Sequence, residues 1–231
     1  MSHLHYKAVI FDLDGTLLYT LPDIARAVNH ALQTKGLPPQ PLEAYRQKVG
    51  WGLDETIRLA LPEELQPSAA DSGLLSELVE ELISEYRRAP YELTTPYDGV
   101  PEMLSELRQR GAAVAVLSNK EHELTTIVVR ELLPQIEFFA VQGVSASVPP
   151  KPDPTGVRQL LSAAPASPSE VLYVGDSGVD MQTALAAELY PLGVSWGYRP
   201  VQELRANGAQ SILDRPEQLL DMFPDLLLDR M

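Results

Sequence analysis

The spacing of hydrophobic residues changes along the chain. From about residue 20 to residue 90, apolar residues recur at helical intervals, with a period of four from Ile24 to Leu32 and a wider stripe over residues 74–86. A Thr20-x-x-Asp23 sequence precedes the first stripe and is typical of a helix amino terminus. We therefore predict that this stretch consists of helices and contains no strand.

Outside this stretch, short continuous apolar runs alternate with helical periods. The runs are Ala8–Phe11, Ala112–Leu117, Phe138–Val141, Val171–Val174, Leu192–Val194 and Ser211–Leu213. Continuous apolar strands separated by helices are typical of a parallel sheet that is covered on both faces. We predict an α/β fold with a doubly wound, Rossmann-like parallel sheet, formed by residues 1–18 and 95–231 and interrupted by an all-helical domain at residues 19–94.

Three of the predicted strands end in polar side chains, namely Asp12 with Asp14, Ser118 with Asn119, and Asp176. A turn alone would explain any one of them, because short polar residues often end a strand. Parallel strands, however, bring their carboxyl ends to one edge of the sheet, where open α/β sheets bind ligands. The recurrence therefore favours a site at that edge.

Two further residues supply charge to this predicted site. Asp180 lies four residues after Asp176 at the start of a predicted helix over about residues 177–187, so both carboxylates can face the same side. A hard cation such as Mg²⁺, with oxygen ligands from Asp12 and Asp176, would relieve the repulsion among these acids. Lys151, in a proline-rich segment, is the candidate fixed cation, although a loop lysine is more often a solvated surface residue.

Composition and charge exclude several classes of protein. The chain has 32 acidic and 18 basic side chains and a net charge of −14, which argues against nucleic acid or an anionic membrane surface as a partner. It has no cysteine, so thiol nucleophiles, thiolate metal sites and disulfides are excluded. It also lacks a continuous apolar run of roughly 18 residues. We expect a cytoplasmic protein, a monomer or homodimer, that acts on a small molecule.

Four motifs in this order closely resemble those of the haloacid dehalogenase superfamily of phosphotransferases. They are Asp12-Leu13-Asp14-Gly15-Thr16, Ser118-Asn119, Lys151-Pro152 and Gly175-Asp176-Ser177-Gly178-Val179-Asp180. Further segments resemble the phosphoglycolate phosphatase branch, namely Val49-Gly50-Trp51-Gly52, Pro96-Tyr97-Asp98-Gly99-Val100, Leu117-Ser118-Asn119-Lys120 and Val194-Ser195-Trp196-Gly197-Tyr198. The resemblance covers essentially the whole chain, including the helical insert after the first motif.

The resemblance implies a role for each acidic residue of the motifs. Asp12 would attack phosphorus and form an aspartyl phosphate, which divides a slow hydrolysis into two easier steps. Asp14 would protonate the leaving oxygen and then deprotonate the attacking water. Mg²⁺ would be held by the Asp12 carboxylate, the Asp14 backbone carbonyl and Asp176, with Asp180 ordering the metal or its waters.

The other motif residues would bind the phosphoryl group. Ser118 and backbone N–H groups beside it, in the segment that includes Asn119, would receive the phosphoryl oxygens. Lys151 would offset the charge on both phosphate and nucleophile. Thr16 would support the first loop around the phosphate.

The helical insert would act as a cap that selects the substrate and excludes water. Arg46, Lys48 and Arg58 flank Gly50-Trp51-Gly52 and could meet a substrate carboxylate such as that of 2-phosphoglycolate, but each could equally be a solvated charge on a helix face. Trp51 is interpreted either as a loop tip facing the site or as a core anchor.

Several related functions stay open at this point. A sugar phosphomutase of the β-phosphoglucomutase type would use the same residues, and a pyrophosphatase or nucleotidase would differ only in the cap. A phospho-aspartate signalling receiver is disfavoured by Asp14 and the helical insert, and the presence of every motif residue disfavours an inactive scaffold.

One departure from the family pattern is Glu188, which stands where relatives usually carry a glycine at a helix end. Glutamate is strained there if the position needs a positive φ.

Overall fold

The computed structural model describes residues 6–66, 68 and 73–223. Its central feature is a six-stranded sheet in the order β5-β4-β1-β6-β7-β8, in which every neighbouring pair is parallel. The strands are β1 (Ala8–Phe11), β4 (Ala113–Glu121), β5 (Ala140–Val144), β6 (Val171–Gly175), β7 (Tyr190–Val194) and β8 (Ser211–Leu213). The predicted α/β class with a parallel sheet is therefore confirmed.

Helices cover both faces of the sheet because each strand buries side chains on both sides. One core contains residues of α4 (Val100–Gln109), α5 (His122–Leu132) and the short helix η3 (Pro216–Met222). The opposite core contains residues of α6 (Thr155–Ala163) and α7 (Gly178–Ala186). Two further short helices are η2 (Pro168–Glu170) and α8 (Val201–Ala206). Of the helices in the described part of the chain, none combines the length and hydropathy that crossing a bilayer requires.

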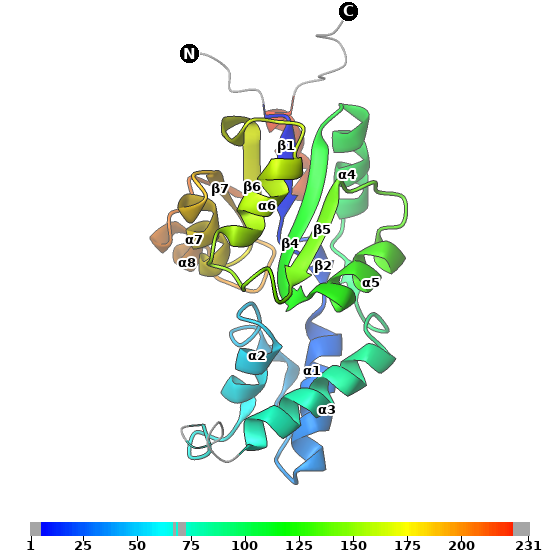
Figure 1. Ribbon diagram of the computed structural model, residues 1–231, viewed down its shortest axis with the longest axis vertical. Coiled ribbons are helices and arrows are strands. Elements are labelled where there is room, and N and C mark those ends of the chain that lie inside the picture. Colours follow the sequence, from blue (N-terminus) through cyan, green and yellow to red (C-terminus); the bar gives the residue numbers. More distant parts are fainter. Residues whose placement is uncertain (1–5, 67, 69–72, 224–231) are drawn as a thin grey trace, which may run out of the picture.

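The helices between Leu21 and Arg88 form a second body at the opposite end of the molecule (Figure 1). It contains α1 (Leu21–Thr34), η1 (Leu42–Tyr45), α2 (Leu53–Ala60) and α3 (Leu74–Arg88), packed around a separate apolar cluster that includes Tyr45, Leu82 and Tyr86. As predicted, the described residues from 20 to 90 contain helices and no strand.

The chain passes between the two bodies through a two-stranded antiparallel pair. Strand β2 (Leu18–Tyr19) leads out of the sheet region and β3 (Thr95–Pro96) leads back. Leu18 lies opposite Pro96 and Tyr19 lies opposite Thr95. Both crossings of the chain are therefore held side by side.

The predicted cap of α1 is wrong in its detail, because Thr20 makes no side-chain hydrogen bond to the start of the helix. Its hydroxyl lies 3.0 Å from the Tyr198 hydroxyl, a partner that is distant in the sequence. The carboxylate of Asp23 accepts hydrogen bonds from the N–H groups of Leu93 and Thr94 and from the Thr94 hydroxyl, at 2.9, 2.8 and 2.7 Å. Tertiary contacts at the chain crossing have thus replaced a local cap.

Strands β4 and β5 differ most in length or position from the predicted runs. β4 continues to Glu121, four residues past the predicted end at Leu117, so that Ser118 and Asn119 lie inside the strand. Its pairing with β5 shifts register between Leu117 and Glu121, which accommodates these polar residues at the sheet edge. β5 begins at Ala140 rather than at Phe138.

Candidate active site

The carboxyl ends of β1, β4 and β6 converge as predicted, and they meet the helical insert across a cavity. The sheet side contributes Asp12, Asp14, Ser118, Asn119 and Lys120. The insert contributes the opposite wall, which is more apolar and consists of Ile24, Val49, Gly50, Gly52, Leu53 and Thr56. The cavity measures about 20 Å³, which is room for roughly one water molecule. The two bodies are therefore closed on each other in this structure.

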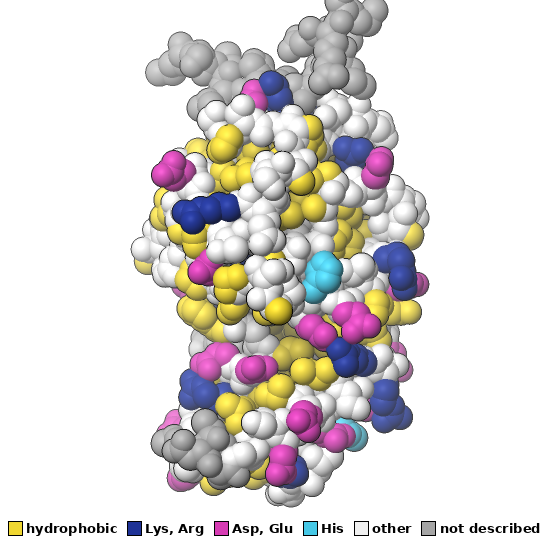
Figure 2. Space-filling model, in the orientation of Figure 1, with side chains coloured by type: hydrophobic (Ala, Val, Ile, Leu, Met, Phe, Trp, Pro, Cys, Tyr) yellow, Lys and Arg dark blue, Asp and Glu magenta, His cyan; other side chains and the backbone are white. Residues whose placement is uncertain are grey.

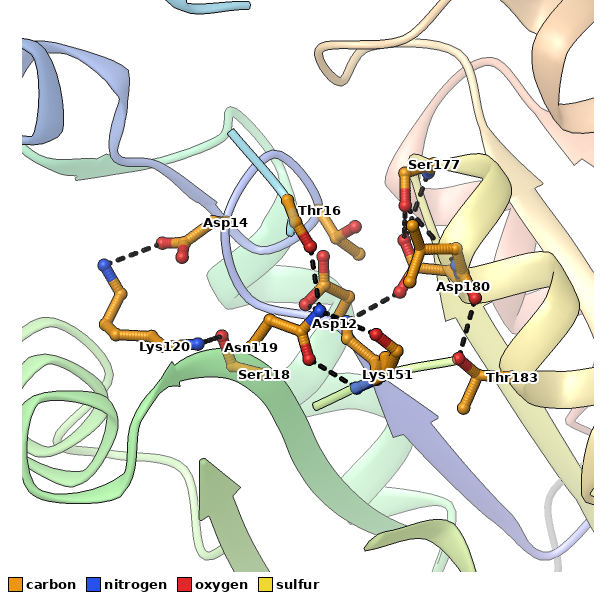
Figure 3. Close-up of polar contacts among 12 residues, drawn as sticks. Asp12, Asp14, Thr16, Ser118, Asn119, Lys120, Lys151, Ser177, Asp180 and Thr183 are labelled. Atoms are coloured by element: carbon orange, nitrogen blue, oxygen red, sulfur yellow. Dashed lines mark hydrogen bonds and ion pairs between the residues drawn. The ribbon is translucent and has the colours of Figure 1, made fainter. Parts of the chain in front are cut away.

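Lys151 lies between two carboxylates at the centre of the site (Figure 3). Its Nζ is 2.6 Å from Oδ1 of Asp12 and 2.7 Å from Oδ1 of Asp180, and only 4% of its side chain is exposed. Burial alone would lower the pKa of Lys151, but Asp12 and Asp180 outweigh it and hold that pKa well above its ordinary value. The proline-rich segment thus delivers a charged ammonium to the predicted nucleophile.

Asn119 fixes the backbone that carries Lys151. Its Oδ1 accepts a hydrogen bond from the Lys151 N–H at 2.6 Å, and its Nδ2 donates to the Lys151 carbonyl at 3.2 Å. The same Nδ2 donates to the carbonyl of Gly50 in the insert at 2.9 Å. In this structure the side-chain amide of Asn119 is occupied by these protein groups and positions Lys151, and its contact with substrate stays a prediction.

Three buried carboxylates stand close enough to share one cation. Ligand oxygens of Asp12, Asp176 and Asp180 all lie within 4.8 Å of one another. Burial and then Asp180 raise the pKa of Asp12 well above its ordinary value, although Lys151 opposes this change. The same two causes raise the pKa of Asp176 to about 7. The raised pKa values reflect burial and the repulsion among neighbouring carboxylates. Carboxylate oxygens are also the ligands that hard divalent cations prefer. The residues present therefore fit a divalent metal.

Hydrogen bonds hold these carboxylates in place. The Tyr198 N–H donates to Oδ2 of Asp176 at 2.7 Å, and the Thr16 hydroxyl donates to Oδ1 of Asp176 at 3.4 Å. Ser177 caps α7 and donates from its N–H and its hydroxyl to Oδ2 of Asp180, at 3.1 and 2.6 Å. Thr16 thus faces the acidic group and supports it, rather than lining the cavity.

Glycine allows the first loop to approach this acidic group. A Cβ added at Gly15 would lie 2.4 Å from Oδ2 of Asp176, and Gly15 also has a φ of +88°. The Asp-Gly-Thr sequence therefore needs its glycine for both backbone conformation and space.

Asp14 lies in the cavity wall but points away from the three carboxylates. Its Oδ1 is 3.1 Å from Nζ of Lys120, and the two side chains face each other in Figure 3. Ser118 lies beside them, where its hydroxyl accepts a hydrogen bond from the Lys120 N–H at 3.2 Å. A metal contact of Asp14 would thus come from its backbone carbonyl, as the resemblance implies, and not from its side chain.

Lys120 is a site residue that the sequence reasoning missed. It is 3% exposed, and besides Asp14 its Nζ contacts the hydroxyl of Tyr86 in α3 at 2.6 Å and lies 4.5 Å from the centre of the Tyr86 ring. Burial alone would lower the pKa of Lys120, but Asp14 and Tyr86 raise it above its ordinary value. The sequence feature that could have identified Lys120 is its position directly after the polar end of a buried strand.

The predicted basic residues of the insert do not line the cavity that contains Asp12. Arg58 forms two hydrogen bonds with Glu55, at 2.7 and 2.6 Å, and Lys48 donates to the carbonyl of Ala44 at 3.1 Å. Arg46 lies 3.7 Å from Glu43. Each of the three lies beside a residue three or four positions earlier in the chain, and their contact with a substrate carboxylate stays a prediction.

Trp51 is 45% exposed and stands at a neighbouring pocket instead of anchoring a core. That pocket, of about 260 Å³, lies between insert and sheet and is also lined by Asn119 and Glu121. Trp51 is thus a loop-tip residue beside the site, separate from the wall around Asp12.

Exposed ion pairs join the rims of the two bodies. Arg87 of α3 lies 2.7 Å from Glu121 and 3.1 Å from Glu123. In Figure 2, acidic and basic side chains are interspersed over the face shown, including the level at which the helical body meets the sheet. Because such pairs are solvated, each contributes at most about 1 kcal/mol and can open readily.

Comparison with known proteins agrees with this geometry. A model of the haloacid dehalogenase-like hydrolase family matches residues 9–194. Phosphoglycolate phosphatase from Pseudomonas putida is 32% identical over 214 residues, covering 93% of this chain and 78% of that protein. Phosphoglycolate phosphatase from Vibrio parahaemolyticus is 31% identical over 223 residues, covering 96% of this chain and 98% of that protein.

A solved structure gives the same result for the fold. The crystal structure of a protein from Lactobacillus delbrueckii subsp. bulgaricus superposes with a TM-score of 0.84 at 28% identity, covering 93% of this chain and 97% of that one. The family match over residues 9–194 contains the helical insert and the four motifs described above. The chain therefore belongs to the haloacid dehalogenase-like hydrolase family.

Proposed function

We propose that this hydrolase is a Mg²⁺-dependent phosphatase that cleaves small phosphate monoesters through an aspartyl phosphate on Asp12, with 2-phosphoglycolate as its preferred substrate. The observation that carries the proposal is the position of Asp12, whose carboxylate contacts Lys151 and stands in a cavity shared with a second acid, Asp14. The names of the relatives from Pseudomonas putida and Vibrio parahaemolyticus support the substrate.

In the first step, a carboxylate oxygen of Asp12 attacks phosphorus and the bond from phosphorus to the leaving oxygen breaks. Asp14 gives its proton to that oxygen, so the leaving group departs as an alcohol and not as an alkoxide. Lys151 offsets the negative charge on nucleophile and phosphoryl group, and the Ser118 hydroxyl and neighbouring N–H groups would receive phosphoryl oxygens.

In the second step, water attacks the phosphorus of the aspartyl phosphate and Asp14 takes up the proton of that water. The carboxylate of Asp12 is released and inorganic phosphate forms. Asp12, Asp176 and the Asp14 carbonyl would hold the metal, with Asp180 ordering its surroundings; when bound, the cation supplies positive charge that stabilises the phosphoryl oxygens. Asp14 is what distinguishes this reaction from a dehalogenase, which needs no acid for the leaving group.

We also propose that residues 19–94 act as a cap that opens for substrate entry. A cavity of about 20 Å³ cannot admit a phosphorylated compound, so the insert has to move away from the sheet edge first. The solvated pairs of Arg87 and the few hydrogen bonds to the insert loop, from Asn119 to Gly50 and from Arg199 to Val49, are contacts that such a movement would break.

The test is phosphate release with Mg²⁺ over a panel of 2-phosphoglycolate, sugar phosphates, nucleotides and pyrophosphate. We expect 2-phosphoglycolate to have the highest kcat/KM. Asp12→Asn should abolish release, whereas Asp221→Asn, an exposed aspartate on η3, should leave it unchanged.

Other outcomes would identify the alternatives. Labelling of Asp12 in a single turnover without steady release of phosphate would indicate a phosphomutase. A preference for pyrophosphate or nucleotides would reassign the substrate but keep the mechanism. Phosphate release that survives in Asp12→Asn would contradict the mechanism itself.

A further inference from the structure

One charged group that lines the cavity has no role in the proposed reaction. Lys120 lines the cavity together with Asp12, Asp14 and Ser118, yet no step above uses its ammonium. Its side chain is 1% exposed, so the charge is removed almost completely from water. A buried charge is costly unless a partner of opposite sign compensates it, and in this structure Asp14 provides that partner at 3.1 Å.

Lys120 differs from the other cations that could face a substrate. Among the described residues that line this cavity it is the one lysine or arginine. Lys151 is already held by two carboxylates, and Arg46, Lys48 and Arg58 of the insert do not line this cavity. A second anionic group on a substrate would therefore find its counter-charge at Lys120.

The described contacts of Lys120 bring one negative charge close to its ammonium, that of Asp14. The hydroxyl of Tyr86 contributes a hydrogen bond at 2.6 Å but no negative charge. The leaving group of a substrate has to lie beside Asp14, the proposed acid, so an anionic substituent on that leaving group would lie near Lys120.

We propose that Lys120 is the residue that recognises the substrate's second anionic group, a carboxylate on the leaving group. This inference rests on the proposed function and assigns the recognition of a phosphorylated acid to the sheet side of the site. Tyr86, on the far side of Lys120, fixes the ammonium from α3 of the insert, so closure of the cap completes the carboxylate site.

The experiment compares two substrates that share a phosphate and a two-carbon skeleton and differ in the carboxylate, namely 2-phosphoglycolate and monoethyl phosphate. Lys120→Met keeps the length of the side chain and removes its charge. We expect kcat/KM for 2-phosphoglycolate to fall by about 10- to 100-fold more than kcat/KM for monoethyl phosphate, the usual loss for one charge-assisted hydrogen bond, because any effect through Asp14 is common to both substrates.

A second variant and a control accompany Lys120→Met. Tyr86→Phe keeps the ring and removes the hydroxyl. We expect it to lower kcat/KM selectively for 2-phosphoglycolate as well, with a fold-loss about a tenth as large as that of Lys120→Met. The inference is therefore testable even if Lys120→Met does not fold. Lys35→Met, an exposed lysine of the insert paired with Glu77, should leave both substrates unaffected. Thermal melting reports whether each variant is folded.

The outcomes separate this inference from the proposed function. Equal losses on the two substrates in Lys120→Met would overturn the inference and assign Lys120 to the support of Asp14. Wild-type hydrolysis that does not favour 2-phosphoglycolate over monoethyl phosphate would overturn it as well, while leaving a phosphatase. The absence of hydrolysis of any monoester would overturn the proposed function.

Calorimetry gives a readout of the inference that needs no turnover. Wild-type protein should bind 2-phosphoglycolate more tightly than monoethyl phosphate, and Lys120→Met should bind both alike. Equal binding of the two ligands by the wild type would contradict the inference.

Discussion

Glu188 occupies a backbone conformation that is strained for any residue except glycine. Its φ is 60°, the single positive value for a non-glycine residue in the described part of the chain. The Leu189 N–H bonds to the carbonyl of Ala184 at 2.9 Å and the Glu188 N–H bonds to that of Leu185 at 3.1 Å, which is the Schellman arrangement at the end of α7. The expectation of a glycine-type position is confirmed, and no compensating contact of Glu188 is described.

Replacing Glu188 by glycine should therefore stabilise the protein. The left-handed conformation costs a side-chain-bearing residue about 1–2 kcal/mol, and the greater freedom of glycine in the unfolded chain offsets about half of that. We expect the free energy of unfolding of Glu188→Gly to rise by about 0.5–1 kcal/mol, measured by chemical denaturation. Ala186→Gly, two residues earlier in helical backbone, is the matched control and should be destabilising; a loss of stability in both variants would contradict this account.

Residue identities predicted the members of the site better than the directions of their side chains. Asp12, Ser118 and Asp176 meet at one sheet edge because parallel strands require it, so their neighbourhood follows from the sequence. That Asp14 turns toward Lys120 depends on Tyr86, which reaches the site from another body of the fold. No local pattern encodes such a contact between distant segments.

At the scale of elements, α1 is attached to the returning chain through a single buried carboxylate. Asp23 is fully buried, and one of its oxygens accepts three hydrogen bonds from Leu93 and Thr94. The sequence pattern correctly indicated a helix start near Thr20 but assigned the wrong use to its polar residues. Local motifs specify which groups are available, whereas packing decides which partners they find.

Removing this carboxylate should be strongly destabilising. Asp23→Ala leaves three donors without an acceptor, and the two on Thr94 are buried, so we expect a loss of about 3 kcal/mol in the free energy of unfolding. Glu80→Ala, an exposed acid of α3, should change it by less than about 0.5 kcal/mol. Urea titrations of both variants test this, and a loss below about 1 kcal/mol for Asp23→Ala would show that Asp23 does not anchor the crossing.

At the scale of the whole molecule, the sheet edge gathers negative charge in a protein whose net charge is already −14. Lys151 contacts two of the three clustered carboxylates and is, among the described residues, the one ammonium beside them, so the folded state gains from any cation that binds among them. The sequence predicted this cluster from strand ends and helical spacing. How tightly the insert covers it follows from the packing of two bodies, which periodicity does not reveal.

Divalent cations should therefore stabilise the fold. At about 100 times its dissociation constant, Mg²⁺ bound only to the folded state adds about 2.7 kcal/mol, or roughly 5–10 °C in Tm for a chain of this size. Thermal melts with Mg²⁺ and after chelation measure the difference. Asp176→Asn should remove most of the shift, and a shift that persists in this variant would place the cation elsewhere.

The antiparallel pair of β2 and β3 has a consequence for how this architecture can vary. Because Leu18 and Tyr19 lie opposite Pro96 and Thr95, the points of departure and return are adjacent, whatever the length of chain between them. An insert of different size or shape could be exchanged at this junction without altering strand register in the sheet. The size and contacts of the insert can therefore change while the sheet edge that carries Asp12, Lys120 and Lys151 is retained.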